Sequence, residues 1–441
     1  MSGSRTVCLL ALALSLAGVF SQAGCGLLLD LDPAEHEDGD AAAALDASVE
    51  VGVLDARAGN DGPVGDSGMT RPLCARPKPL EVADLDAGST HTCLIAADGS
   101  LWCWGGNSGG ALGVGDRIDR WEPTLVHAGP WRRVSAGASH TCAILARDRS
   151  LWCWGTNAHG ELGTGGADAL SPELVLPGAT WLAVSAGDQF TVAVRTTAAG
   201  IDTAGSLWAW GSNARSQLGT GDTTSTTVPV LADATAMYRD VSVGAMGGCA
   251  RTTVDLPKCW GVNTYGECGT GATTIGFVEP IPAYVMSEEI GYQVVSRGAD
   301  FTVSSHNGGL FSWGHNAFGT LGTGDLVDRS TPSGVPFPPF DWVSVAAGAQ
   351  HACGIAGDRV LRCWGAGTYG ELGLGPTPPV SSPTPVGADA DWVTVTAGSG
   401  FTCGAHAGGR LACWGANGVG QLGLGVAGAG TERDTPADAC W

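Results

Sequence analysis

Paired cysteines are the residues of this sequence whose type and spacing point most directly to chemistry. Five pairs, ten or eleven positions apart, recur along the chain: Cys93–Cys103, Cys142–Cys153, Cys249–Cys259, Cys353–Cys363 and Cys403–Cys413. Two equivalent segments lose both cysteines together, with Val192 and Ala209 in one and Val303 and Ser312 in the other. Joint presence and joint loss indicate contact, and facing strand residues lie about 4.5–5.5 Å apart at Cα, so we predict five disulfides. The alternative is that free thiols pack as small apolar groups.

The remaining cysteines have separate interpretations. Cys25 follows Ala23-Gly24 at the end of an apolar run, the pattern of a lipid-acceptor cysteine, and we expect lipidation there. Cys74 and Cys440 lie at the two ends of the repeated region, so we expect a sixth disulfide between them. Cys268 stands where other segments have Leu, and we interpret it as a buried substitute. A zinc site would need two cysteine pairs to converge, and separate repeats keep the pairs apart.

No other constellation of residues predicts catalysis or a bound cofactor. His91, His140 and His351 share a position at which Phe190 and Phe301 also occur, which is typical of packing rather than metal binding. No Ser-His-Asp order, His-Glu-x-x-His motif or paired-carboxylate signature stands out. The Gly-x-Gly strings have no helix after them, so phosphate binding is not supported. We therefore predict a protein that is not an enzyme, with no catalytic, cofactor-binding or metal-binding residues.

Acidic residues dominate the charged positions. The 441-residue chain has 43 acidic and 22 basic residues and a formal net charge of -21. Nucleic-acid binding rests on clustered Lys and Arg, so no nucleic-acid partner is expected. Asp116, Asp222 and Asp325 follow glycine turns, and we interpret them as turn caps, with a shallow cation site as the alternative.

The N-terminus carries the features of an export signal. Arg5 precedes an apolar run over residues 7–20, which is too short to cross a bilayer comfortably and is followed by small residues. We predict a signal peptide of the lipoprotein type over residues 1–24, which would place the protein on the outer membrane or cell surface of a bacterium through a lipid anchor only. Cleavage after Ala23 would instead give a periplasmic or secreted chain.

Residues 25–72 are predicted to form a disordered linker rich in Asp, Ala and Gly. Residues 30–66 contain eight Asp and three Glu against Arg57, and no aromatic residue. Such a segment cannot bury enough apolar surface to offset the entropy of ordering. We interpret it as an acidic spacer that holds the following domain away from a membrane.

Residues 73–441 consist of seven repeats. The dipeptide Trp-Gly ends the same short segment in each copy, at Trp104, Trp154, Trp210, Trp260, Trp313, Trp364 and Trp414. Each copy continues to Leu-Gly or Cys-Gly and is preceded by a dipeptide that is usually Ala-Gly. We place the repeats near residues 80–130, 131–180, 181–237, 238–291, 292–341, 342–391 and 392–441.

Each repeat is predicted to form four short strands. Residues 91–95 and 100–104 are apolar runs separated by Ala96-Ala97-Asp98-Gly99, and Asp-Gly between such runs is a strong hairpin signal. Four strands, seven times over, are typical of a propeller whose blades bury their faces against their neighbours. The chain is therefore predicted to be all-β, with a single seven-bladed β-propeller of four-stranded blades. In a closed ring the C-terminal Trp441 would return to the first blade.

The repeat resembles that of the regulator of chromosome condensation family. Residues 150–165, Ser-Leu-Trp-Cys-Trp-Gly-Thr-Asn-Ala-His-Gly-Glu-Leu-Gly-Thr-Gly, contain nearly the whole consensus of that family's repeat. The resemblance covers residues 80–425, and seven is also the number of repeats in the family's propeller. It implies the fold but no single activity, because this scaffold serves a nucleotide-exchange factor, a plant light receptor and a bacterial β-lactamase inhibitor.

Three functional hypotheses follow. The first is a monomeric, non-enzymatic binding protein of the cell envelope whose propeller loops recognise a protein or a glycan. The second is a propeller-type lyase or glycosidase with its site at the central mouth. The third, guanine-nucleotide exchange, is implied by the resemblance alone and conflicts with export, because no GTPase is expected outside the cell.

Overall fold

The computed structural model describes residues 81–441 except 128, 197–202, 273–276, 288–290 and 337–340. The predicted signal peptide (1–24) and linker (25–72), together with Cys25 and Cys74, lie outside the described residues. All regular elements of the described part are strands, which confirms the all-β prediction. No helix that could cross a membrane is found in that part.

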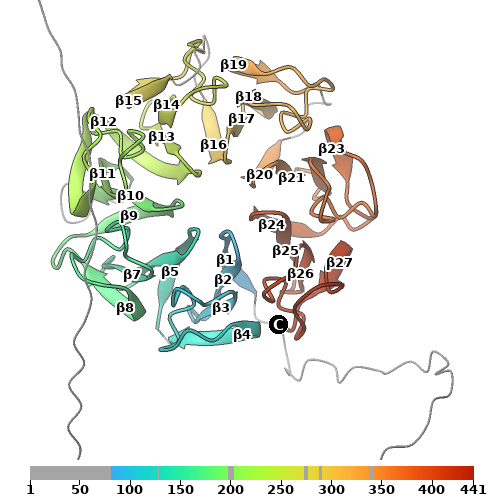
Figure 1. Ribbon diagram of the computed structural model, residues 1–441. Coiled ribbons are helices and arrows are strands. Elements are labelled where there is room, and N and C mark those ends of the chain that lie inside the picture. The colour runs from blue at the N-terminus through green and yellow to red at the C-terminus, as the bar shows by residue number, and fades with distance from the viewer. Residues whose placement is uncertain (1–80, 128, 197–202, 273–276, 288–290, 337–340) are drawn as a thin grey trace, which may run out of the picture. The chain divides into compact units, whose positions relative to one another are not determined.

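Five of the sheets have four antiparallel strands in sequence order (Figure 1). The first two sheets are β1 (Val82–Ala87), β2 (His91–Ala96), β3 (Leu101–Gly105) and β4 (Arg120–His127), and β5 (Trp131–Ala136), β6 (His140–Leu145), β7 (Leu151–Gly155) and β8 (Ala169–Val175). Two more are β16 (Tyr292–Arg297), β17 (Phe301–His306), β18 (Gly309–Gly314) and β19 (Arg329–Gly334), and β20 (Trp342–Ala347), β21 (His351–Ala356), β22 (Leu361–Gly365) and β23 (Val380–Pro385). The last is β24 (Trp392–Ala397), β25 (Phe401–His406), β26 (Leu411–Gly415) and β27 (Arg433–Asp438).

The sixth sheet has seven strands and corrects the expectation of seven separate blades. It contains β9 (Trp181–Ala186), β10 (Phe190–Thr196), β11 (Gly205–Gly211), β12 (Thr226–Val243), β13 (Gly247–Thr252), β14 (Pro257–Val262) and β15 (Val278–Tyr284). The first part of β12 pairs with β11 and its last part with β13, so the third and fourth repeats share one strand. The connection over residues 231–238 contains no Gly or Pro to interrupt the strand, whereas Gly129-Pro130 and Pro177-Gly178 interrupt the equivalent connections after β4 and β8.

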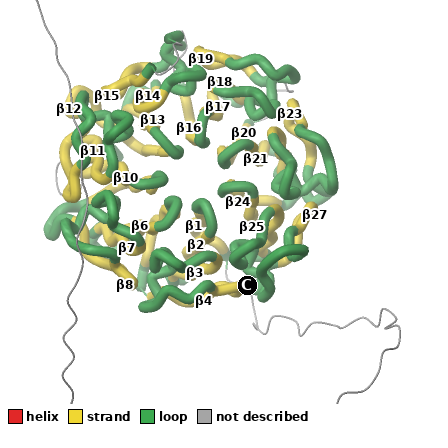
Figure 2. Tube along the Cα trace, viewed as in Figure 1, coloured by secondary structure: helices red, strands yellow, loops and turns green. Residues whose placement is uncertain are grey.

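Strand register places two kinds of connection at the same end of each sheet. In the first sheet Ala87 pairs with Thr92. Gly105 pairs with His91 on one side and with Arg120 on the other. The loops after the first and third strands of each repeat therefore leave from one end, which we call the loop face. The hairpins between the second and third strands leave from the opposite end, which we call the hairpin face. Figure 2 shows loops gathered around the central opening.

The repeated cysteines occupy facing positions on the second and third strands of their repeats. Cys93 pairs in register with Cys103, and Val192 pairs with Ala209 at the same place in a repeat without cysteines. The Cα atoms of the five pairs lie 4.0–4.1 Å apart, which is compatible with cross-strand disulfides. Cys440 also takes part in a disulfide, and its expected partner Cys74 lies outside the described residues.

Cys268 occupies the position that Leu holds in the other repeats. It is fully buried, its thiol is free, and burial raises the pKa of that thiol to about 12. Its backbone N–H donates to the Asn263 Oδ1 atom over 2.8 Å, as that of Leu112 donates to Asn107 over 2.9 Å. The structure therefore gives Cys268 the same packing and backbone role as the Leu that it replaces.

One fully buried Trp in each repeat joins that repeat to the one before it. The indole Nε1 of Trp154 donates to the Ala111 carbonyl oxygen over 2.9 Å, and five further repeats make the equivalent bond. At the seam between the last and first repeats, Trp104 donates to the Gln421 oxygen over 3.0 Å. The ring of Trp441 packs edge-on against Trp102, with centroids 5.7 Å apart, so the expected return of the C-terminus to the first repeat is confirmed.

Glycines bring neighbouring repeats together around the axis. A Cβ atom added to Gly88 would lie 2.1 Å from the Gly137 carbonyl oxygen, and one added to Gly398 would lie 2.5 Å from that of Gly88. No side-chain carbon can approach an oxygen so closely, so these positions require glycine. The second contact lies at the seam and therefore closes the ring.

We expect Gly398→Ala to destabilise the seam. The added methyl group must displace backbone of the first repeat, and overpacking of this kind lowers the free energy of unfolding by about 1–3 kcal/mol. Guanidinium denaturation followed by tryptophan fluorescence measures the loss. The control is Gly418→Ala in the same repeat, where no atom lies within 4 Å of the added carbon. Equal denaturation midpoints for the two variants would show that the seam does not depend on this approach.

Candidate functional site

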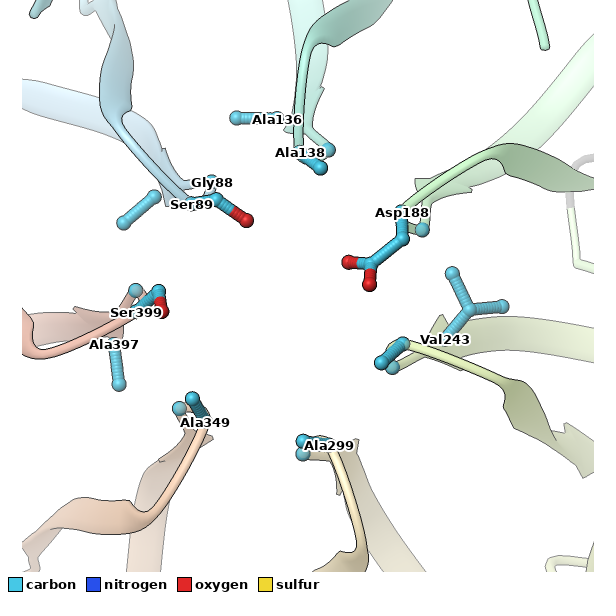
Figure 3. A pocket seen from close by; sticks show the side chains of 18 of the residues that line it. Gly88, Ser89, Ala136, Ala138, Asp188, Val243, Ala299, Ala349, Ala397 and Ser399 are labelled. Carbon is cyan, nitrogen blue, oxygen red and sulfur yellow. The ribbon is translucent and has the colours of Figure 1, made fainter. Parts of the chain in front are cut away.

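A cavity of about 210 Å³ opens at the axis on the loop face. Every repeat contributes three consecutive residues to its lining: 87–89, 136–138, 186–188, 243–245, 297–299, 347–349 and 397–399. Figure 3 shows the Asp188 carboxylate and the Ser89 hydroxyl pointing into the opening, with small alanine side chains around much of the remainder. Because most of the lining residues are small, the cavity is open at the axis, and the few polar side chains such as Asp188 and Ser89 project into it.

Asp188 is the one carboxylate in the described lining of this cavity. Desolvation by the surrounding loops raises its pKa above the usual range, although the side chain is exposed at the mouth. Arg297 also lines the cavity, but its guanidinium is buried and its Nη2 donates to the Val262 carbonyl oxygen over 3.2 Å. A glycosidase needs two carboxyl groups about the scissile bond, and the described lining supplies one. The cavity can accept a hydrogen bond from a hydroxyl or ammonium group.

The three histidines at the shared repeat position lie between repeats, behind the cavity lining. His91, His140 and His351 are fully buried. Their Nε2 atoms lie 2.8 Å from the Oγ1 atoms of Thr141, Thr191 and Thr402, each in the following repeat. These hydroxyls donate their own hydrogens to carbonyl oxygens, so each histidine donates through Nε2–H and its Nδ1 is unprotonated.

Burial keeps these imidazoles neutral. It lowers the pKa of His91 and His351 to about 4 and, with a contribution from His91, that of His140 to about 3. The sequence carries part of this pairing. The repeats after Phe190 and Phe301 have Gly248 and Ala352 in place of the threonine that accepts from histidine, although Thr92 is retained after Phe401. The three histidines therefore join repeats and do not reach the cavity.

We expect His140→Phe to reduce the loss of stability in acid. Below pH 6.5 the unfolded chain binds a proton at this residue, and the folded chain does not until about pH 3, so stability falls as the pH falls through that window. At pH 5 one such residue costs roughly 2 kcal/mol. Melting temperatures between pH 7 and pH 5 should decline less for the variant than for the parent protein.

The reverse substitution tests the same effect. Phe401→His places a histidine opposite Thr92, which donates to the Gln421 oxygen as the other threonines do to theirs. This variant should lose stability more steeply in acid than the parent protein. Parallel profiles for all three proteins would contradict the assignment of buried neutral histidines.

The three turn aspartates hold the long loops after the third strands. Asn107 Nδ2 donates to the Asp116 carboxylate over 3.2 Å, and the equivalent amides contact Asp222 and Asp325 over 3.0 and 3.1 Å. Arg120 and Arg329 also pair with the carboxylates of Asp116 and Asp325, at 2.6 Å. These contacts support the interpretation as turn caps, and two of the three carboxylates already have a guanidinium beside them.

One ligand-like group was missed in the sequence. Asp389, Asp391 and His406 gather on the hairpin face of the last repeat, with ligand atoms within 4.8 Å of one another. His406 is buried against Trp392, and its Nδ1 lies 2.6 Å from Asp391. Arg410 lies 2.8 Å from the His406 Nε2 and 2.6 Å from Asp389, so a guanidinium already supplies positive charge there. The available signal was His406 itself, which stands where the first two repeats have Ala96 and Leu145 and where the fifth has His306.

Two clefts flank the loop over residues 416–432 of the last repeat, also on the loop face. The larger, of about 580 Å³, lies toward the sixth repeat and is lined by Tyr369, Glu432 and Asp434 among others. The smaller, of about 420 Å³, crosses the seam and is lined by Asp119, Arg120, Trp121, Glu122, Thr124 and Gly425. Tyr369 is 59% exposed and Trp121 is 50% exposed. Each cleft therefore combines one exposed ring with carboxylates.

Family models match most of the repeats. The model for the regulator of chromosome condensation (RCC1) repeat matches residues 98–144, 148–194, 204–250, 307–355 and 363–405, more than half of the chain. A second model of this repeat matches residues 82–111, 131–161 and 342–371.

Known proteins show the same likeness. The ultraviolet-B receptor UVR8 of Arabidopsis thaliana is 29% identical over 310 residues, which cover 67% of this chain and 68% of the receptor. Protein RCC2 of Homo sapiens is 30% identical over 220 residues, 41% of either chain. Yeast RCC1 (Prp20), solved with Kap60, shares the fold with a TM-score of 0.67 at 19% identity, covering 88% of this chain and 91% of its own. A structure of Prp20p from Saccharomyces cerevisiae, described with its binding to Gsp1p and histones, has a TM-score of 0.66 at 19% identity, covering 82% of this chain and 86% of its own.

Proposed function

Because the chain belongs to the regulator of chromosome condensation (RCC1) repeat family, we propose that it is a non-enzymatic binding module of the cell envelope. Its loop face recognises a protein or glycan partner, and the chain acts as a monomer. The propeller scaffold suits this role, since yeast RCC1 was solved bound to a protein, Kap60.

The observation that carries this proposal is the contrast between repeated interior and unrepeated surface. The buried Trp and the axial Gly recur in every repeat. Two residues beyond the loop-face Asn or its equivalent, the residue changes from repeat to repeat: Gly109, His159, Arg215, Tyr265, Phe318, Tyr369 and Val419. These positions are structurally equivalent, so the fold does not account for the different side chains. We attribute the differences to the binding of a partner. Exposed aromatic and Arg side chains are the types enriched in binding hot spots.

The envelope location rests on the sequence. The apolar run before Cys25 and the acidic segment over residues 30–66 support export followed by anchoring through a lipid on Cys25. An oxidising compartment would also favour the six disulfides that we propose, including Cys74–Cys440.

Mass spectrometry of the mature protein tests both the lipid anchor on Cys25 and the proposed disulfides. We expect an N-terminal Cys25 carrying diacylglycerol, and alkylation in denaturant should label one thiol, that of Cys268. A Cys25→Ser variant should lose the lipid mass and leave the membrane fraction. A mature N-terminus at another residue would contradict the lipid anchor. Ten or more alkylated thiols would contradict the disulfides.

Substitutions on the two faces test the binding role. Tyr265 is 39% exposed on the loop face and stacks on His315 with centroids 4.2 Å apart. Tyr265→Ala should reduce the recovery of cross-linked envelope partners at least about fivefold, a change of roughly 1 kcal/mol. The control is Val254→Ala on the hairpin face, where the side chain is 58% exposed. Equal recovery by both variants, or no partner at all, would count against recognition by the loop face.

A further inference from the structure

The exposed ring of the smaller cleft belongs to a residue that the fold does not require. Trp121 contacts Gly420 of the neighbouring repeat, since a Cβ added to that glycine would lie 2.6 Å from the indole Cδ1. The equivalent glycines of other repeats face smaller or polar residues: Leu170, Thr227, Ser330, Ser381 and Asp434. The position therefore accepts serine, and an indole that is half exposed there has no packing role that the other repeats share.

Three carboxylates of the clefts have no side-chain partner in the described part of the protein, whereas a fourth, Asp119, accepts from the Asn107 N–H over 2.7 Å. Glu122, Glu432 and Asp434 are exposed, and no hydrogen bond or ion pair of their side chains is found there. A carboxylate in this state presents two acceptor oxygens to a ligand. Each cleft thus offers the flat face of an aromatic ring and hydrogen-bond acceptors beside it.

We propose that the two clefts are subsites for a neutral oligosaccharide that lies across the loop of the last repeat. A sugar ring has a face of C–H groups that packs on an aromatic ring, and hydroxyls around its edge that donate to carboxylates. The volumes of about 580 and 420 Å³ fall in the range of small-molecule sites, roughly 300–1,000 Å³. This inference rests on the proposed binding function and names its ligand class.

The charges at the clefts select this ligand over others. An anionic glycan would be repelled by the three unpaired carboxylates. A basic peptide would also be attracted by them and by the rings, but its cationic groups can only donate, so they cannot use the guanidinium of Arg120 in the smaller cleft, which pairs with Asp116 at 2.6 Å. A hydroxyl both donates and accepts, so it can use the carboxylates and the guanidinium together. A neutral sugar fits all of these groups.

Calorimetric titration of the full-length protein with four neutral hexasaccharides, cello-, malto-, xylo- and chitohexaose, tests the proposal. At least one should bind, and Trp121→Ser and Tyr369→Ala should each weaken it about tenfold, or roughly 1.4 kcal/mol. Both variants should fold, because other repeats carry Ser or Val at these positions, and their melting temperatures verify this. The matched control, Leu326→Ser, removes an apolar side chain that is 61% exposed on the loop face outside both clefts and should leave affinity unchanged.

Two outcomes would overturn the proposal. One is the failure of all four hexasaccharides to bind, or binding that survives both substitutions. The other is tight binding of decalysine that either cleft substitution abolishes, which would assign the clefts to a basic peptide. In either case the loss of cross-linked partners in Tyr265→Ala still decides the binding function by itself, so the two proposals fail separately.

Discussion

The hydrogen bond from each buried indole to a carbonyl of the preceding repeat is the interaction on which the rest of the structure depends. A single four-stranded sheet leaves both of its faces uncovered, and each Trp fills the space between two sheets while its N–H finds an acceptor in the neighbour. The same bond from Trp104 to Gln421 joins the last repeat to the first. Stability is therefore distributed around the ring, and each repeat needs two neighbours.

The axial glycines limit where a binding site can be formed. Because neighbouring backbones touch at Gly88 and Gly398, the central mouth has a fixed rim of small residues. Apart from a few polar groups at the mouth such as Asp188, side chains that differ among repeats stand further out, on the long loops after the third strands. The geometry thus separates an invariant interior from a variable loop face, and the proposed recognition uses the second.

The sequence predicted most of the fold because the repeats could be compared with one another. Joint loss of cysteines identified facing strand positions such as Val192 and Ala209, and the tolerance of Phe identified the packing role of the histidines. The shared strand β12 was missed because no residue signals it. Residues 231–238 simply lack the Gly or Pro that interrupts the strand in the other connections. The smaller cleft was also missed, since Trp121 and the loop over residues 416–432 are far apart in sequence and meet only after the ring closes.

The continuous strand β12 makes the ring mechanically unequal. Elsewhere, neighbouring repeats are held together by side-chain packing and isolated hydrogen bonds. The third and fourth repeats are also joined by one continuous strand, which belongs to the sheet of both. A circular permutant with new termini in the connection over residues 231–238 would sever a strand. One opened between β8 and β9 would cut only a turn. The ring should therefore tolerate new termini between β8 and β9 and should not tolerate them within β12.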